Sequence, residues 1–322
     1  MTNSLTPTHG VKADTGPLLV FGEALVDDFV TEQVVGGAPF NVARSLAAFG
    51  LAPLLITRTG NDPAGALVRA EFARFGMRQD GLQLDAAEPT GRVLVERAHG
   101  EHRFVILPNQ AYDHIDAAAA LAAVAGPPPA TIYFGTLAQR CETSRGALRA
   151  LLAASTASCY LDLNVREGQV TERCVFESLH LADIVKVNED ELRNLFGWYT
   201  HTRHATQHMD SVAVRSACAT LIRTFSLQGL IVTLGPRGAV YFGADGAVVT
   251  AHDTAGPARL VDTVGAGDAF SAVFLLGQAR GWPLDTTLTR ANAFAGAVCG
   301  IRGAVPADLA FYEPWLSRWL VD

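Results

Sequence analysis

The stretch VDTVGAGDAFSAVF, from Val261 to Phe274, places two glycines and a carboxylate where a helix is about to begin. The apolar residues that follow recur at helical spacing, which predicts a helix that runs to about Arg280 and ends at Gly281. A carboxylate in the first turn of a helix is favourable by itself, so Asp268 has an ordinary structural interpretation. Whether it also has a chemical role depends on the rest of the chain.

The backbone amides of Gly265, Ala266 and Gly267 lie at the predicted N-terminus of this helix. Because the first N–H groups of a helix have no intrahelical acceptor, such a turn binds phosphate without a basic side chain. Asp268 would repel a bound phosphate unless a substrate hydroxyl lay between the two. A carboxylate in this place is therefore costly for binding alone, but it is suited to accepting the proton of a hydroxyl that attacks phosphorus.

The bulk composition describes a globular chain of 322 residues, of which 49% are hydrophobic. The formal charge of -7 argues against a broad basic face for nucleic acid or an anionic membrane. Five scattered cysteines without a C-x-x-C pair suit reduced thiols in the cytoplasm, where we expect the protein to work. Residues 1–16 have neither a basic start nor an apolar core, so we expect a flexible tail before a single domain over 17–322.

Short apolar strands alternate with helices along most of the chain, as in PLLVFG followed by the helical pattern APFNVARSLAAFG. This alternation predicts an α/β fold: a doubly wound, mainly parallel sheet flanked by helices. Two regions, about 25–35 and 92–107, read as strands without intervening helices. Since ligands of such folds lie beyond the carboxyl ends of the parallel strands, these extra strands predict a small β-sheet lid over the site.

Three stretches together resemble the signatures of a known family: GEALVDDFV, GGAPFNVARSLAAFG and DTVGAGDAF. They are similar to those of the ribokinase-type, or PfkB, carbohydrate kinases, and the resemblance extends from about Leu18 to Pro306. It implies a ribokinase-like fold with a β lid and an ATP-dependent kinase that uses Mg²⁺. It also implies transfer of the γ-phosphate to a primary hydroxyl of a small sugar.

The resemblance assigns roles to matching residues. Asp268 is similar to the family's catalytic base, and Gly265, Ala266 and Gly267 to its anion hole. The positions that match sugar-binding residues are Asp27, Gly36, Gly37, Asn41 and Arg166. Those that match the ATP and magnesium site are Asn188, Glu191, Thr233, Gly235, Gly238, Asn292 and Ala295. Asn188 and Glu191 could equally form a capping box, and Thr233 to Gly238 could be an ordinary glycine-bearing hairpin.

A monovalent cation such as K⁺ often lies beside the anion hole in this family, near an acid that matches Asp262. Asp262 could equally brace its own turn. Three histidines, His201, His204 and His208, have helical spacing but no accompanying cysteine or carboxylate set, which favours a solvated insertion over a metal site.

Within the family, the stretches YFGTLA and LDLNVRE look most like those of fructokinases. Ala38 stands where ribokinases have lysine after the double glycine, which disfavours ribose. Phe40 replaces a usually small residue, and the stretch from Arg103 to Ile115 lacks a basic lid residue. Fructose or a related ketose is therefore the expected substrate, with 2-keto-3-deoxygluconate, another sugar or a nucleoside as alternatives.

Other functional classes fit less well. A dinucleotide-dependent oxidoreductase is disfavoured because no G-x-G-x-x-G follows the first strand, and no G-x-x-x-x-G-K indicates a P-loop enzyme. A regulator that binds sugar or nucleotide without catalysis would not need the acid beside the glycines. The apolar stretch RVLVE in the predicted lid suggests a homodimer formed through that lid.

Overall fold

The computed structural model describes residues 16–29, 32–98, 101–200, 206, 208–252 and 260–320. The strands of its main sheet are β1 (Leu18–Phe21), β4 (Leu54–Gly60), β5 (Leu82–Asp85), β8 (Thr131–Phe134), β9 (Ser158–Asp162), β10 (Ile184–Asn188), β11 (Gly229–Thr233), β12 (Ala239–Gly243) and β13 (Val248–Ala251). Their order across the sheet is β13-β12-β11-β10-β9-β8-β1-β4-β5. The pairs from β11 to β5 are parallel, whereas β12 and β13 add an antiparallel edge.

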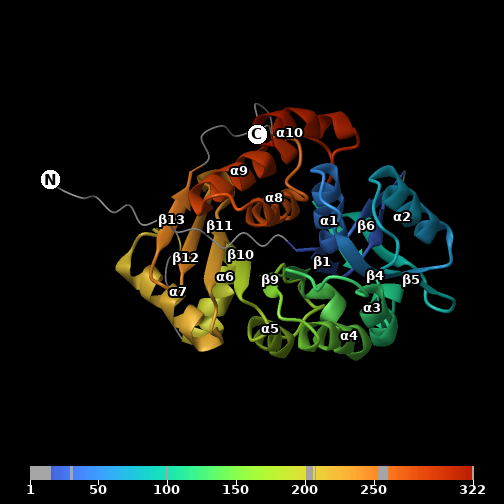
Figure 1. Cartoon of the computed structure of the whole chain (residues 1–322), viewed down its shortest axis with the longest axis horizontal. Helices are drawn as coiled ribbons and strands as arrows, with labels where there is room; N and C mark the ends of the chain where they lie inside the picture. Colours follow the sequence, from blue (N-terminus) through green and yellow to red (C-terminus); the bar gives the residue numbers. More distant parts are fainter. Residues whose placement is uncertain are drawn as a thin grey trace.

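Helices cover both faces of this sheet (Figure 1). One face carries α1 (Ala38–Ala48), α2 (Pro63–Arg74), α8 (Ala266–Arg280), α9 (Leu284–Val298) and α10 (Glu313–Trp319). The other carries α3 (Ala117–Ala123), α4 (Glu142–Ala153), α5 (Glu172–Leu179), α6 (Glu189–Leu195) and α7 (Val212–Phe225). Each layer buries its own apolar cluster against the sheet, which is why the strands are apolar on both sides. The predicted doubly wound fold is confirmed.

A second, four-stranded sheet has the order β3-β2-β6-β7. Its strands are β2 (Leu25–Asp28), β3 (Gln33–Gly36), β6 (Gly91–Ala98) and β7 (Glu101–Ile106). The predicted extra strands therefore form the separate small sheet that the sequence led us to expect. This sheet is called the lid below.

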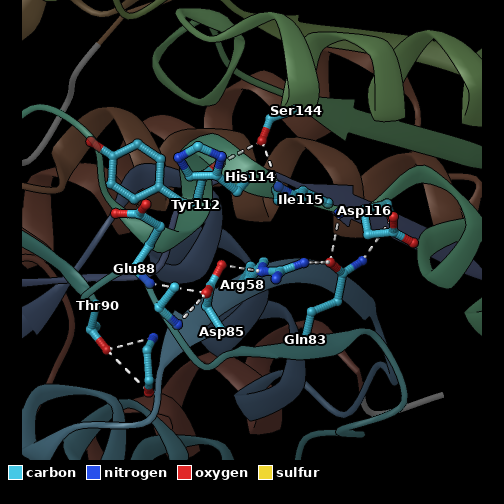
Figure 2. A network of polar contacts seen from close by, with 12 residues as sticks. Arg58, Gln83, Asp85, Glu88, Thr90, Tyr112, His114, Ile115, Asp116 and Ser144 are labelled. Atoms are coloured by element: carbon cyan, nitrogen blue, oxygen red, sulfur yellow. Dashed lines mark hydrogen bonds and ion pairs between the residues drawn. The ribbon is translucent and has the colours of Figure 1, made fainter.

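Polar contacts fix the base of the lid to the main sheet (Figure 2). Before the β6–β7 hairpin of the lid, Asp85 at the end of β5 accepts a hydrogen bond from Arg58 Nε at 2.7 Å. After this hairpin, the amide of Asp116 donates to Gln83 Oε1 at 2.7 Å. Ser144 Oγ, on α4, accepts from the amide of Ile115 at 2.8 Å. The segments on both sides of the hairpin are thus anchored.

Local patterns predicted the helices well, because their starts carry capping residues. α2 begins after Asp62, whose side chain accepts from the amide of Gly65, and α7 begins after Ser211, which accepts from Val214. The glycine-bearing hairpin that the sequence offered around Thr233 to Gly238 is formed by β11 and β12, whereas the edge strand β13 was not predicted. Residues 1–15 of the predicted tail, and also His201 and His204, lie outside the described residues.

Candidate active site

The N-terminus of α8 lies at the carboxyl-terminal edge of the parallel strands, above β9 and β10. Gly265 is its N-cap with φ 79°, and a side chain there would collide with the backbone of Ala304, whose Cα is 2.4 Å from the ideal Cβ position. No side chain caps this end. Within the described residues, the amides of Gly265 and Gly267 have no backbone acceptor, while that of Ala266 donates to Thr263 O at 3.3 Å. The turn therefore presents open donors to an anion.

Asp268 is the third residue of α8, and its carboxylate does not cap the helix. Instead, Oδ2 accepts a hydrogen bond of 2.7 Å from Nδ2 of Asn41 on α1. Arg44 fixes the orientation of that amide, because its Nη2 donates to Asn41 Oδ1 at 2.6 Å. Arg44 is in turn held by Glu71 at 2.7 Å. Asn41 thus acts as an orienting residue for the carboxylate, with both ends of its amide in use.

The pKa of Asp268 is raised to about 6, chiefly because the carboxyl group is buried and also because Asp162 is negatively charged. The Asn41 hydrogen bond and the charges of Lys186 and Arg166 oppose this rise. At neutral pH the group is therefore ionised, but it is a stronger base than an exposed aspartate. This is the range that suits a general base.

A buried ion pair lies directly below the glycine turn. Lys186, in the middle of β10, donates from Nζ to both carboxylate oxygens of Asp162, at the end of β9, at 2.8 Å. Ser271 Oγ on α8 donates to the same carboxylate at 2.8 Å. Lys186 Nζ is only 3.2 Å from the point where a Cβ on Gly267 would lie. A larger residue at Gly267 would press on this ammonium, so the glycine keeps a positive charge close to the open amides.

A small polar pocket opens beyond the ends of β1, β8 and β9. Its charged and amide side chains are Glu23, Asp162, Asn164 and Arg166. Glu23 is 4% exposed, and its Oε2 has no hydrogen-bond partner within the described residues. Burial raises the pKa of Glu23 to about 7. The pocket is therefore lined by groups that bind hydroxyls, which is the requirement for a polyol.

Asp27, on the lid strand β2, lies near enough to this pocket to be affected by Arg166. Burial raises the pKa of Asp27 to about 6, while the charges of Arg166 and Arg44 lower it. The charge of Arg166 also lowers the pKa of Glu23 and that of Asp268, so one guanidinium acts on all three carboxyl groups. The structure thus brings together the predicted sugar-binding residues from the lid, α1 and the loop after β9.

Steric contacts explain why both residues of the pair at the end of β3 are glycines. A Cβ on Gly36 would lie 2.8 Å from Asp27 Oδ2, and one on Gly37 would lie 2.5 Å from the backbone oxygen of Glu23. Gly37 also has φ 105°, which disfavours any side chain. Phe40, which follows on α1, is fully buried and stacks on Phe72 with ring centroids 5.0 Å apart. Its ring packs between α1 and α2 and does not line the small pocket.

At the start of α6, Asn188 and Glu191 form a closed capping box. Asn188 Oδ1 accepts from the Glu191 amide at 2.9 Å, and Glu191 Oε2 accepts from the Asn188 amide at 2.8 Å. The other oxygen, Oε1, accepts from the amide of Val165 at 2.8 Å. Glu191 therefore ties α6 to the loop that carries Arg166, which is the structural alternative that the sequence left open.

The remaining positions assigned to ATP follow β11 and lie on α9. Thr233 Oγ1 donates to Val187 O at 3.3 Å, and Gly235 and Gly238 have positive φ in the turn between β11 and β12. A Cβ on Gly238 would lie 2.0 Å from Ala251 O, so this glycine also permits the packing of β13. The two positions on α9 are Asn292, which is buried, and Ala295, which is partly buried.

Asp262 braces the turn before α8. Its Oδ1 accepts from the Val264 amide at 3.0 Å and its Oδ2 from the Gly303 amide at 3.3 Å. Within the described residues, no group of three or more His, Cys, Asp or Glu could hold a metal ion. The two hydrogen bonds of Asp262 correspond to the bracing role that the sequence left open for it.

The comparison with family models gives one match, to the pfkB family carbohydrate kinases, over residues 18–309. The chain belongs to this family. The match includes both the lid and the α8 turn, so the family assignment covers the whole site. The chain is therefore a carbohydrate kinase, as its sequence signatures led us to expect.

Individual relatives agree with this assignment. The chain is 32% identical to a fructokinase from Klebsiella pneumoniae over 303 residues, covering 88% of this chain and 92% of the relative. A fructokinase structure from Vibrio cholerae O395 with fructose, ADP and calcium bound superposes with a TM-score of 0.74 at 24% identity, over 93% and 99% of the two chains. An aminoimidazole riboside kinase from Salmonella enterica gives a TM-score of 0.74 at 25% identity, over 95% and 100%.

Neither Glu23 nor Lys186 was predicted as a site residue from the sequence, and the pairing of Lys186 with Asp162 was not predicted, although Asp162 belongs to the stretch LDLNVRE that resembles fructokinases. Lys186 is the single charged residue of β10 (Ile184–Asn188), and such a residue is rarely buried without a partner. Glu23 is the second residue after β1, at the edge where α/β proteins bind ligands. The charge within β10 and the acid after β1 can both be found in the sequence once the ends of these two strands are known.

Proposed function

We propose that the protein is an ATP-dependent kinase that transfers the γ-phosphoryl group to a primary hydroxyl of fructose or a related ketose. The observation that carries the proposal is the ionised, oriented carboxylate of Asp268 beside the open N-terminus of α8. The fructokinase relatives support fructose, and the polar pocket around Arg166 supports a polyhydroxylated substrate.

Each residue has a defined part in the transfer. Asp268 accepts the proton of the attacking hydroxyl, and its raised pKa increases its basicity for this step. The amides of Gly265 and Gly267 and the ammonium of Lys186 stabilise the negative charge that develops on the transferred group. Asp162 holds that ammonium in place, and Asn41 holds the base.

Mg²⁺ is part of this proposal as a partner of the ATP phosphates, where it neutralises charge. Proteins usually hold Mg²⁺ with one or two carboxylates together with substrate phosphates. Asn188 and Glu191 would hold the ion directly or through water, because each carboxylate oxygen of Glu191 keeps a lone pair beyond its one backbone hydrogen bond. A K⁺ ion near Asp262 could likewise use this carboxylate, because each of its oxygens accepts only one amide.

The sugar is tested by ADP release across fructose, tagatose, ribose, 2-keto-3-deoxygluconate and nucleosides. We expect the highest kcat/KM for fructose or another ketose. A higher value for a nucleoside would favour a riboside kinase such as the Salmonella enterica protein. Activity on none of them would favour a binding protein without catalysis. For any substitution of Asp268, the matched control is Asp285→Asn. It removes an exposed acid from the first turn of α9 and should leave the rate unchanged.

We also propose a homodimer formed through the lid and a cytoplasmic location. The lid has two edge strands, β3 and β7, and such edges are available for pairing with a second copy. None of the helices in the described part of the chain has the length and apolar character needed to cross a bilayer. Light scattering after size-exclusion chromatography tests the dimer, and a monomer at all concentrations would contradict it.

A further inference from the structure

A second cavity, of about 410 Å³, lies at the starts of α4 and α5. These helices pack on the face of the sheet opposite to α8 (Figure 1). The volume falls within the range of small-molecule sites, which span roughly 300–1,000 Å³. Such sites are usually apolar, whereas this lining is charged. The charged residues are Arg140, Glu142, Arg145, Arg149, Arg173 and Glu177.

The cavity has more positive than negative charge. Arg140 is held by Asp113 at 2.7 Å, which leaves three arginines for two glutamates. Glu177 bonds both Arg149 at 2.8 Å and Arg173 at 2.9 Å, and Glu142 bonds Arg145. One positive charge therefore has no counterpart in the lining.

Arg145 gives a second, independent indication. Its Nε is buried and has no oxygen acceptor within the described residues, and the Cys174 thiol beside the guanidinium is only a weak acceptor. A buried N–H without an acceptor is costly, and each guanidinium offers five donors. Glu142, the carboxylate now on Arg145, is 72% exposed, so its ion pair is weak and an incoming anion can replace it.

The cavity and the sugar pocket are distinct, since they share no lining residue. The same two loops nevertheless contribute to both. Leu137 lines the sugar pocket and Arg140 the cavity, while Arg166 lines the first and Gln169 the second. The cavity is thus a separate site next to the sugar pocket.

We propose that this cavity binds a phosphorylated small molecule that carries at least two phosphate groups. Arg145, Arg149 and Arg173 can each form two parallel hydrogen bonds to a phosphate, and a ligand with two phosphate groups meets more of these donors at once than inorganic phosphate does. The volume also exceeds what a single phosphate requires. The site is independent of the catalytic anion hole at α8.

Inorganic pyrophosphate is the probe, and its binding is measured by titration calorimetry at low salt. Arg145→Gln combined with Arg149→Gln should weaken binding by at least about tenfold, because charge-assisted hydrogen bonds are lost. Glu142→Gln should tighten binding several-fold, because it removes the competing carboxylate. Arg78→Gln is the matched control, since this exposed arginine pairs with Asp80 outside the cavity. Inorganic phosphate should bind much more weakly than pyrophosphate.

The α8 turn could also bind pyrophosphate, so each titration is repeated in a Gly267→Asp background, where the added carboxylate repels anions from that turn. Binding that persists there and is weakened by the double arginine variant supports the proposal. Binding that Gly267→Asp abolishes, or that the arginine variants leave unchanged, overturns it. Absence of binding in every variant also overturns it. Thermal melting of each variant shows that the chains compared are folded.

Discussion

The helices α8 and α6 begin in similar ways and serve different purposes. Each carries an acid as its third residue, Asp268 in α8 and Glu191 in α6. In α6 the acid returns to its own N-cap, so the helix end is closed. In α8 the N-cap is a glycine, and the acid turns to Asn41 on another helix.

Under the function proposed above, this difference separates a structural acid, Glu191, from a chemical one, Asp268. An N-cap side chain satisfies the first amides of a helix, and an anion then has few donors left to bind. Where the cap is absent and the acid has a distant partner, the amides stay open and the carboxylate stays available. The hydrogen-bond partner of the acid therefore says more about the role of a helix start than the local pattern of glycine and acid does.

Replacing Asp268 by asparagine should have the largest effect of the changes considered, and the matching change of Glu191 to glutamine, described last, should have the smallest. Asp268→Asn removes the base and should lower kcat by about 10²–10⁴-fold. The melting temperature should not fall, because the variant removes a buried carboxylate whose pKa is already raised. Coupled ADP release and a thermal melt measure the two effects. A rate within a few fold of that of the unmodified protein would exclude Asp268 as the base.

Lys186→Met tests the charge beneath the α8 turn. It leaves the carboxylate of Asp162 buried without its partner, which should cost about 3–5 kcal/mol in the free energy of unfolding. Urea denaturation measures this loss. Adding Asp162→Asn should restore most of the stability but not the rate. A single variant as stable as the unmodified protein would show that the pair is not held as described.

Glu23→Gln tests the burial of the pocket carboxyl through pH. The unfolded chain releases this proton near pH 4.5 and the folded chain near 7, so the carboxyl costs stability as pH rises through that window. At pH 8 the variant should be more stable by on the order of 1–3 kcal/mol. At pH 4 the two proteins should unfold alike. An equal difference at both pH values would mean that titration is not the cause.

Glu191→Gln should have the smallest effect. It weakens the capping box of α6 and should cost about 1 kcal/mol in the free energy of unfolding. Because Glu191 acts through backbone hydrogen bonds, we expect kcat to change by only a few fold. A loss of rate as large as that of Asp268→Asn would remove the distinction between the two helix starts.

Much of this architecture could be predicted from local sequence. The helix over Val212–Phe225 was found because its apolar period and its cap agree, and the α8 turn was found because glycines and an acid stand before an apolar run. The partner of Asp268 was not predictable in this way, since Asn41 lies 227 residues away. The pairing of Lys186 with Asp162 likewise depends on β10 lying next to β9.

The central claim is that Asp268, held by Asn41, accepts the proton of the sugar hydroxyl. Its most direct test is the pH profile of kcat/KM for fructose in the unmodified protein and in Asn41→Ala. The rate should decline below about pH 6 as Asp268 becomes protonated. In Asn41→Ala this limb should move to higher pH, because the hydrogen bond that lowers the pKa of Asp268 is lost. A limb that stays at the same pH would contradict the claim.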